Sequence, residues 1–164
     1  MLVGLVVVLA VSGTAAAGGS ISSCDQNGNS KDTFNPGEGV YITGSCIVDL
    51  DNDGVGDIYV VKNKVWSNGD TITDVVLKKT DVPINSVNGK AYFLANVGNN
   101  PGEIPYPGEY DVIYDLDKDG TYDAGEDPID SVVCAGFETI PEFTTIAIPA
   151  ALALLAGLFV LRRR

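Results

Sequence analysis

The stretch between residues 18 and 140 keeps no long run of apolar residues at helical spacing, and this constrains the fold more than any other feature. Short runs of β-branched and aromatic residues instead alternate with clusters of Gly, Pro, Asn and Asp, the pattern of strands joined by turns. The predicted strands cover residues 39–47, 56–65, 71–78, 90–96, 109–114 and 129–137. About seven short strands predict an all-β domain over residues 18–140, of the immunoglobulin-like β-sandwich type.

The N-terminal segment indicates export. Residues 2–11 are apolar, and the small residues that follow include Ala15-Ala16-Ala17, an A-x-A cleavage pattern. This arrangement is typical of a secretory signal peptide, although no Lys or Arg precedes the apolar run. We therefore predict that residues 1–17 are a signal peptide. A lipoprotein-like sequence ends at Cys24 and leaves lipidation of this cysteine as an alternative, but small residues separate it from the apolar run.

The C-terminal segment indicates a membrane anchor. Residues 143–161 are uncharged and, as a helix, would nearly match a bilayer core of about 30 Å. The chain then ends with Arg162, Arg163 and Arg164. Because basic residues next to a membrane span stay on the cytoplasmic side, the part of the chain before the span is predicted to lie outside the cell.

Pro141, Glu142 and Phe143 stand directly before this apolar run. Together with the run and the terminal arginines, they resemble the PEF-type C-terminal sorting signal of archaea over residues 141–164. The resemblance implies that an archaeosortase, a membrane cysteine transpeptidase, processes the chain near the PEF motif and transfers it to a lipid anchor. The alternative is a permanent single-span protein. Both predict a location at the cell surface, on the extracellular side of the plasma membrane.

A twelve-residue segment, from Asp115 to Glu126, fits the ligand positions of the EF-hand calcium loop. Gly120 stands where that loop turns sharply. Its flanks differ from a helix–loop–helix hand, because residues 110–114 read as a strand and Pro128 interrupts any following helix. The sequence therefore predicts a Ca²⁺ site in an EF-hand-like loop, with the ligands Asp115, Asp117, Asp119, Thr121, Asp123 and Glu126.

Residues 49–57 repeat the first nine positions of this loop, with Asp49, Asp51, Asp53 and Asp57 as candidate ligands. Val60 occupies the position of the bidentate Glu, so this second site is incomplete. A solvated hairpin turn is the alternative interpretation. Residues 25–29 are also rich in Asx and Gly, for which an ordinary turn is the simpler interpretation.

Several segments resemble a β-sandwich module that recurs in archaeal surface proteins. They are residues 25–29, 31–38, 108–111 and 136–137, and the Pro-Gly-Glu-Tyr sequence at 107–110 is similar to a strand entry common in immunoglobulin-like surface domains. The resemblance implies a surface location and a β-sandwich fold. It implies no particular activity.

Charge and composition exclude several functions. Without the three terminal arginines, 7 lysines face 22 acidic residues, a net charge of −15. Such a charge repels phosphate backbones, so nucleic acid is not an expected partner, and it favours divalent cations as counter-ions. The chain has no histidine, so it cannot form a Ser-His-Asp triad, and its acidic residues cluster in turns without a separate catalytic pair. We therefore predict that the protein is not an enzyme.

Two functions remain after these exclusions. The first is a structural or adhesive surface domain stiffened by Ca²⁺, with self-assembly as an expected mode of action. The alternative is a calcium-dependent carbohydrate-binding module for surface polysaccharide, in which Trp66 or Tyr106 would contact sugar. Three cysteines predict one disulfide, between Cys46 and Cys134 if Cys24 is lipidated, and otherwise open to Cys24.

Overall fold

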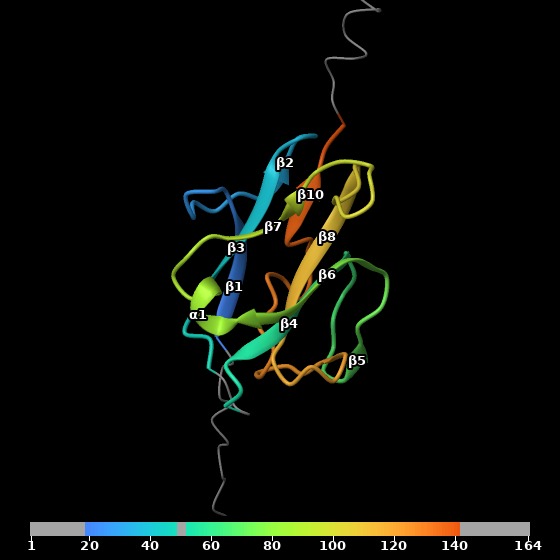
Figure 1. The fold of residues 1–164 in the computed structure, drawn as a ribbon. Coiled ribbons are helices and arrows are strands. Elements are labelled where there is room, and N and C mark those ends of the chain that lie inside the picture. The colour runs from blue at the N-terminus through green and yellow to red at the C-terminus, as the bar shows by residue number, and fades with distance from the viewer. Residues whose placement is uncertain (1–18, 49–51, 142–164) are drawn as a thin grey trace, which may run out of the picture.

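The computed structural model describes residues 19–48 and 52–141 (Figure 1). The predicted signal peptide and the predicted membrane helix lie outside these residues. Within the described ranges, strands dominate and the single helix, α1, is one short turn at Ile84–Val87, which confirms the all-β prediction. No helix in the same ranges is long and apolar enough to cross a membrane.

The strands form two larger sheets and one small one. The first sheet is antiparallel in the order β1-β3-β7, with β1 at Ser20–Cys24, β3 at Gly39–Ser45 and β7 at Tyr92–Asn96. The second has five strands in the order β2-β10-β8-β4-β6, namely Thr33–Phe34, Phe137–Thr139, Gly108–Asp115, Val55–Lys62 and Val75–Pro83. Only its β2–β10 pair is parallel. The small sheet pairs β5 (Asp70–Thr71) with β9 (Thr121–Tyr122).

The two larger sheets share one hydrophobic core. The alternation of strand side chains directs every second residue of a strand to the same face, and these residues are buried. Fully buried members come from both sheets: Val40, Ile42 and Leu94 from the first, and Val60, Val112 and Phe137 from the second, the last within 1% of full burial. Phe34 packs edge-on against Phe137, at 5.7 Å between ring centres.

A second hydrophobic cluster covers the other face of the five-stranded sheet. It comprises Tyr59, Val61, Trp66, Ile72, Ile113 and Tyr122, contributed by β4, β8, β9 and the loops beside them. Strands β4 and β8 are therefore buried on both faces, which explains why each carries a continuous apolar run, at residues 58–61 and 112–114, rather than an alternating pattern.

The predicted strands at residues 39–47, 56–65, 90–96 and 109–114 match β3, β4, β7 and β8 to within a few residues. The predicted strand at 71–78 is wrong as one element, because Asp74 has a left-handed backbone, with φ of 54°, that separates β5 from β6. The predicted strand at 129–137 is also wrong, since only Phe137 of this range belongs to a strand. Strands β1, β2 and β9 were not predicted.

Two predictions about individual side chains are corrected. Trp66 is 5% exposed and its indole N–H donates to Asp111 Oδ2 at 2.8 Å, so it cannot stack on a sugar. All three cysteines are free, which contradicts the predicted disulfide. Cys24 is fully buried, and burial, with the charge of Asp25 as a lesser cause, raises the pKa of its thiol to about 11.

The fold brings two acidic loops to one end of the molecule. Strand β8 ends at Asp115, and its antiparallel neighbour β4 begins at Val55, so that Asp57 pairs with Asp115 in the ladder. The loop after β8 and the turn before β4 are therefore neighbours. Figure 1 shows that they lie at the end of the molecule opposite to the point where the described chain ends, at Pro141.

Candidate metal centre

The loop that follows β8 is organised around the carboxylate of Asp115. Lys118 and Gly120 have left-handed backbones, with φ of 60° and 81°, which fold the chain back over this carboxylate. The backbone N–H of Lys118 donates to Asp115 Oδ1 at 2.8 Å, and the N–H of Gly120 donates to Oδ2 at 3.0 Å. Glycine adopts a positive φ without a steric cost, so Gly120 is the natural residue at this point.

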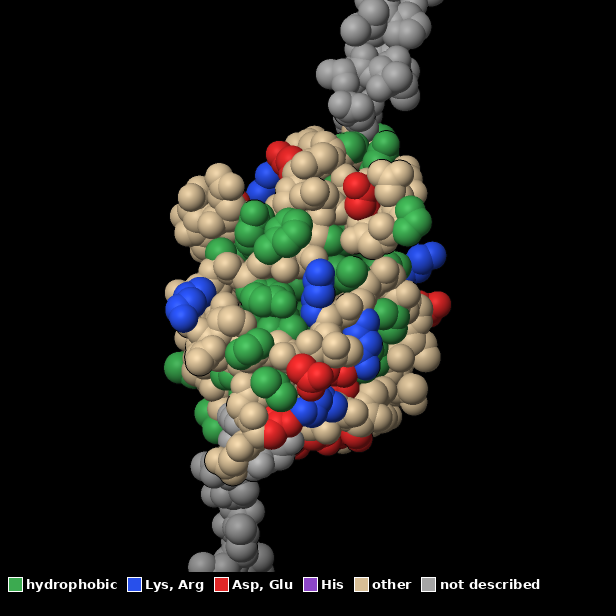
Figure 2. Space-filling model, in the orientation of Figure 1, with side chains coloured by type: hydrophobic (Ala, Val, Ile, Leu, Met, Phe, Trp, Pro, Cys, Tyr) green, Lys and Arg blue, Asp and Glu red, His purple; other side chains and the backbone are tan. Residues whose placement is uncertain are grey.

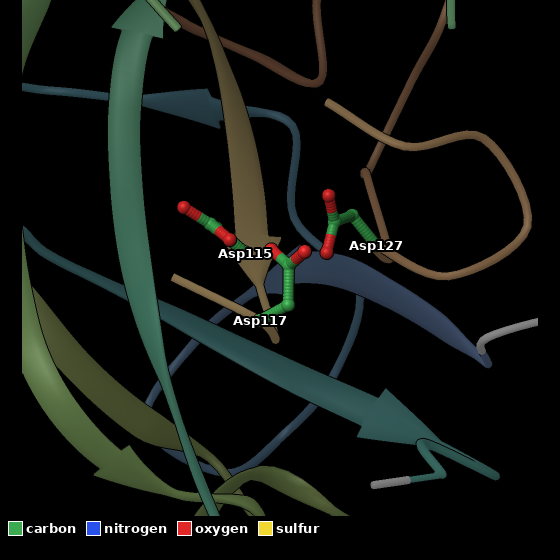
Figure 3. A group of neighbouring side chains, drawn as sticks. All are labelled: Asp115, Asp117 and Asp127. Carbon is green, nitrogen blue, oxygen red and sulfur yellow. The ribbon is translucent and has the colours of Figure 1, made fainter. Parts of the chain in front are cut away.

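Two groups of carboxylates form within the loop. Oxygen atoms of Asp115, Asp117 and Asp127 lie within 4.8 Å of one another, and Figure 3 shows Asp117 and Asp127 pointing toward each other beside the end of β8. The second group, with the same spacing, is Asp117, Asp119 and Asp123. Asp117 is common to both groups. Four of the five side chains predicted as metal ligands in this loop are thereby brought together.

Asp127 is the residue that sequence reasoning missed. The predicted ligand was its neighbour Glu126, which belongs to neither carboxylate group. Asp127 is 4% exposed, and its two oxygens accept the N–H groups of Leu116 and Asp123, both at 2.9 Å. The signal in the sequence was a second acidic residue directly after Glu126, but the twelve-residue spacing favoured the first.

Thr121 was predicted to offer its backbone carbonyl. In the structure its hydroxyl donates a hydrogen bond to Asp119 Oδ1 and lies 3.3 Å from Asp123 Oδ2. Its N–H also donates to Asp119 Oδ1, at 2.7 Å. These contacts, the hydroxyl's first, lower the pKa of Asp119, so this exposed carboxylate is ionised at neutral pH.

The pKa values of the two buried carboxylates of the loop, Asp115 and Asp127, are shifted in the opposite direction to that of Asp119. Burial raises the pKa of Asp115 to about 7 against the hydrogen bonds that it accepts, and the neighbouring Asp117 and Asp127 raise it further. Burial likewise raises the pKa of Asp127 to about 6, with contributions from Asp117 and Asp123. Because a bound divalent cation stabilises the ionised form, it would reverse both shifts.

The donor set is made of oxygen atoms alone. Carboxylate oxygens in this number suit a hard cation such as Ca²⁺, which takes six to eight oxygen ligands in flexible geometry. The acidic groups of this loop can therefore hold a metal ion, and the residues available for it are Asp115, Asp117, Asp119, Asp123 and Asp127.

The turn before β4 has the same backbone pattern but different partners. Asn52 and Gly54 repeat the left-handed conformations of Lys118 and Gly120, with φ of 63° and 79°. Asp53 Oδ1 accepts the N–H of Val55 at 2.9 Å, as Asp119 does for Thr121. The predicted ligands Asp49 and Asp51 lie outside the described residues.

Lysines neutralise the two predicted ligands of residues 49–57 that the structure does describe, Asp53 in the turn and Asp57 in β4. Asp53 forms an ion pair with Lys118, and Asp57 forms one with Lys78 at 2.7 Å. Among the described residues, neither aspartate belongs to a group of carboxylates that could hold an ion. Farther away, Asp25 accepts the N–H groups of Asn27 and Asn29, as expected for an ordinary turn.

The predicted sorting signal is described only at its first residue, Pro141, which follows β10. Glu142, Phe143, Arg162, Arg163 and Arg164 lie outside the described residues. Comparison with known proteins finds no matching family model, no matching curated protein and no matching solved structure.

Proposed function

We propose that the protein is an exported, membrane-anchored cell-surface protein, with a structural or adhesive domain of the immunoglobulin-like β-sandwich type that Ca²⁺ stabilises. The observation that carries the proposal is the pair of buried carboxylates, Asp115 and Asp127, which face Asp117 within 4.8 Å. Burying ionised groups without a partner of opposite charge is costly. A bound cation removes that cost and so stabilises the folded domain.

The anchor is proposed from the sequence of residues 141–164. The apolar segment 143–161 and the arginines beyond it would hold the domain at the outer face of the membrane, and an archaeosortase would process the chain near Pro141. The arrangement in Figure 1 supports this geometry, since the acidic loops lie at the end opposite to Pro141 and would point away from the membrane. A structural ion suits such a position, because extracellular sites need only weak affinity.

Thermal unfolding of the full chain in detergent tests the calcium claim. Millimolar Ca²⁺, compared with a chelator at matched ionic strength, is expected to raise the melting temperature by about 5–10 °C. Asp115→Asn should lose most of this shift, while Asp25→Asn, a control at an ordinary turn, should keep it. An equal melting temperature with and without Ca²⁺ would refute the proposal. The matched ionic strength is needed because salt alone screens the repulsion among the acidic residues.

A carbohydrate-binding function is a second candidate, and one observation favours it. The rings of Tyr41 and Phe93 lie on the first sheet with centres 5.2 Å apart, and Phe93 is 43% exposed. Beside Tyr41 is a hollow of about 280 Å³, whose lining includes Gln26, Asn27 and the ion pair of Lys31 with Glu38. An aromatic face next to amide groups suits a neutral sugar.

The second candidate is tested on an array of neutral glycans. The expected result is binding that disappears in the double variant Tyr41→Ala with Phe93→Ala. Failure of the unaltered chain to bind any glycan, or binding that survives in the double variant, would exclude this surface as a sugar site. A purely structural domain predicts no specific binding with or without Ca²⁺.

A further inference from the structure

Lys118 connects the two acidic loops. It is the third residue after β8, and its backbone N–H donates to Asp115 Oδ1 at 2.8 Å. Its side chain extends in the other direction, to the turn before β4, where the ammonium group forms an ion pair with Asp53 and lies 3.8 Å from Asp81 Oδ1. The side chain is 26% exposed, so water screens this contact only in part.

Further contacts tie the start of β4 to the edge strand β6. The backbone N–H of Asp81 donates to Asp57 Oδ1 at 3.0 Å, and Asp57 Oδ2 accepts the ammonium group of Lys78 at 2.7 Å. Lys118, which is part of the candidate metal loop (residues 115–127), therefore joins Asp53 to Asp81, and the N–H of Asp81 joins it to Asp57. Figure 2 shows acidic and lysine side chains close together at this end of the molecule.

We propose that the ammonium group of Lys118 takes the place of a second metal ion at the turn before β4. A single cation bound in the metal loop would then order both loops, because Lys118 belongs to one loop and pairs with the other. The inference rests on the metal centre proposed above. The two turns share their backbone pattern, yet in the second the carboxylate of Asp53 has an ammonium group as its partner. Lys118 thus stands, beside Asp53, where a cation would stand.

The coupling has a direct structural route. A cation bound by Asp115 and Asp117 fixes the backbone between them and, through the Lys118 N–H bond to Asp115, the base of the lysine side chain. A fixed base restricts where the ammonium group can lie, and its ion pair with Asp53 is then lost less often. Local opening of residues 52–57 should consequently become rarer when the metal loop is occupied.

Hydrogen exchange of the full chain in detergent measures this coupling peptide by peptide. Addition of Ca²⁺ is expected to slow exchange both in residues 115–127 and in residues 52–57, the latter by about tenfold. In Lys118→Met the slowing at 115–127 remains and that at 52–57 is lost. Lys118→Arg, which keeps the charge, should restore it, and Asp53→Asn, which removes the partner, should abolish it. Lys31→Met serves as the control, since Lys31 forms its ion pair with Glu38, outside both loops.

The outcomes separate the two proposals. Slowing in neither segment of the unaltered chain would refute the metal centre itself. Slowing at 115–127 without any change at 52–57, or an equal Ca²⁺ effect at 52–57 in the unaltered chain and in Lys118→Met, would leave the metal centre intact and overturn the role of Lys118.

Discussion

Asp127 and Glu126 are neighbours in the sequence, but among the described residues only Asp127 belongs to a group of carboxylates that could hold a metal ion. The turn from Asp123 to Asp127 places the N–H groups of Glu126 and Asp127 on the carbonyl of Asp123, at 3.0 and 2.9 Å. After this turn the carboxylate of Asp127 lies against the N–H groups of Leu116 and Asp123. The backbone turn, and not the twelve-residue spacing, therefore determines which of the two acidic residues can join the proposed metal site.

The first prediction compares these two residues. Asp127→Asn should weaken Ca²⁺ binding by roughly tenfold or more, equivalent to about 1.4 kcal/mol, whereas Glu126→Gln should change it much less. Titration calorimetry measures the affinity. A larger loss of affinity in Glu126→Gln would show that Glu126 is the ligand.

A further carboxyl group, that of Asp130, lies outside the metal loop and near Asp111. Asp130 Oδ1 accepts the N–H of Val112 at 2.9 Å, and its Oδ2 is buried without a hydrogen-bond partner. Burial, with the nearby charge of Asp111 as a lesser cause, raises the pKa of Asp130 to about 8. Asp111 is itself fully buried and accepts the N–H groups of Lys64 and Gly136 as well as that of Trp66.

This arrangement predicts a pH dependence of stability. The folded-state pKa of Asp130 is raised, so its contribution is complete below the unfolded value of about 4 and is lost as the pH rises through about 8. Between pH 5 and 8 the unaltered chain should lose on the order of 2 kcal/mol more than Asp130→Asn, which cannot ionise. Urea unfolding across this range in excess Ca²⁺ provides the comparison. Parallel pH profiles for the two proteins would contradict the prediction.

At the scale of elements, the pairing of β4 with β8 positions the metal loop. Gly56 lies in this pairing, and a Cβ atom there would meet the ring of Tyr114 at 2.6 Å and the carbonyl oxygen of Asp115 at 2.7 Å. The hydroxyl of Tyr114 in turn donates to the carbonyl of Val82 in β6. A close approach of β4 to the end of β8 is therefore required to hold Asp115 where the loop begins.

Gly56→Ala should consequently lower the free energy of unfolding by about 1–3 kcal/mol, because neither the ring nor the backbone can move without disturbing the core. It should also weaken Ca²⁺ binding by displacing Asp115. Gly54→Ala is the matched control: its φ of 79° costs about 1 kcal/mol, but a Cβ atom there would meet no atom within 4 Å. Urea unfolding ranks the two variants, and an equal or larger loss in Gly54→Ala would contradict the required close approach.

The elements differ in how well the sequence predicts them, for identifiable reasons. Strands β4 and β8 are buried on both faces, so their apolar runs are strong signals. The apolar residues Ile129, Val132 and Val133 suggest a strand. In the structure, however, the carboxylate of Asp130 accepts the N–H of Val112, and this segment pairs with β8 through an isolated bridge from Ile113 to Ile129 instead of a ladder. Strand β1 carries one bulky residue, Ile21, and its pairing with β3 is set by the tertiary fold.

At the scale of the whole molecule, the fold determines which acidic residues meet. The aspartates at positions 115, 117, 119 and 123 are close in the sequence, so their grouping could be predicted from spacing alone. The ion pair of Lys118 with Asp53 spans 65 residues and depends on β4 lying beside β8, which no local pattern reveals. The net charge of −15 before the terminal arginines favours bound cations as counter-ions, and the fold gathers the acidic groups that could hold one in the loop after β8.

The most direct measurement is a crystal structure of the protein grown with Ca²⁺. The account predicts one ion bound 2.3–2.6 Å from carboxylate oxygens of Asp115, Asp117 and Asp127, with Lys118 still paired to Asp53. An ion held by Glu126 in place of Asp127, an ion at the turn before β4 with Lys118 displaced, or a loop without any ion at millimolar Ca²⁺ would contradict it.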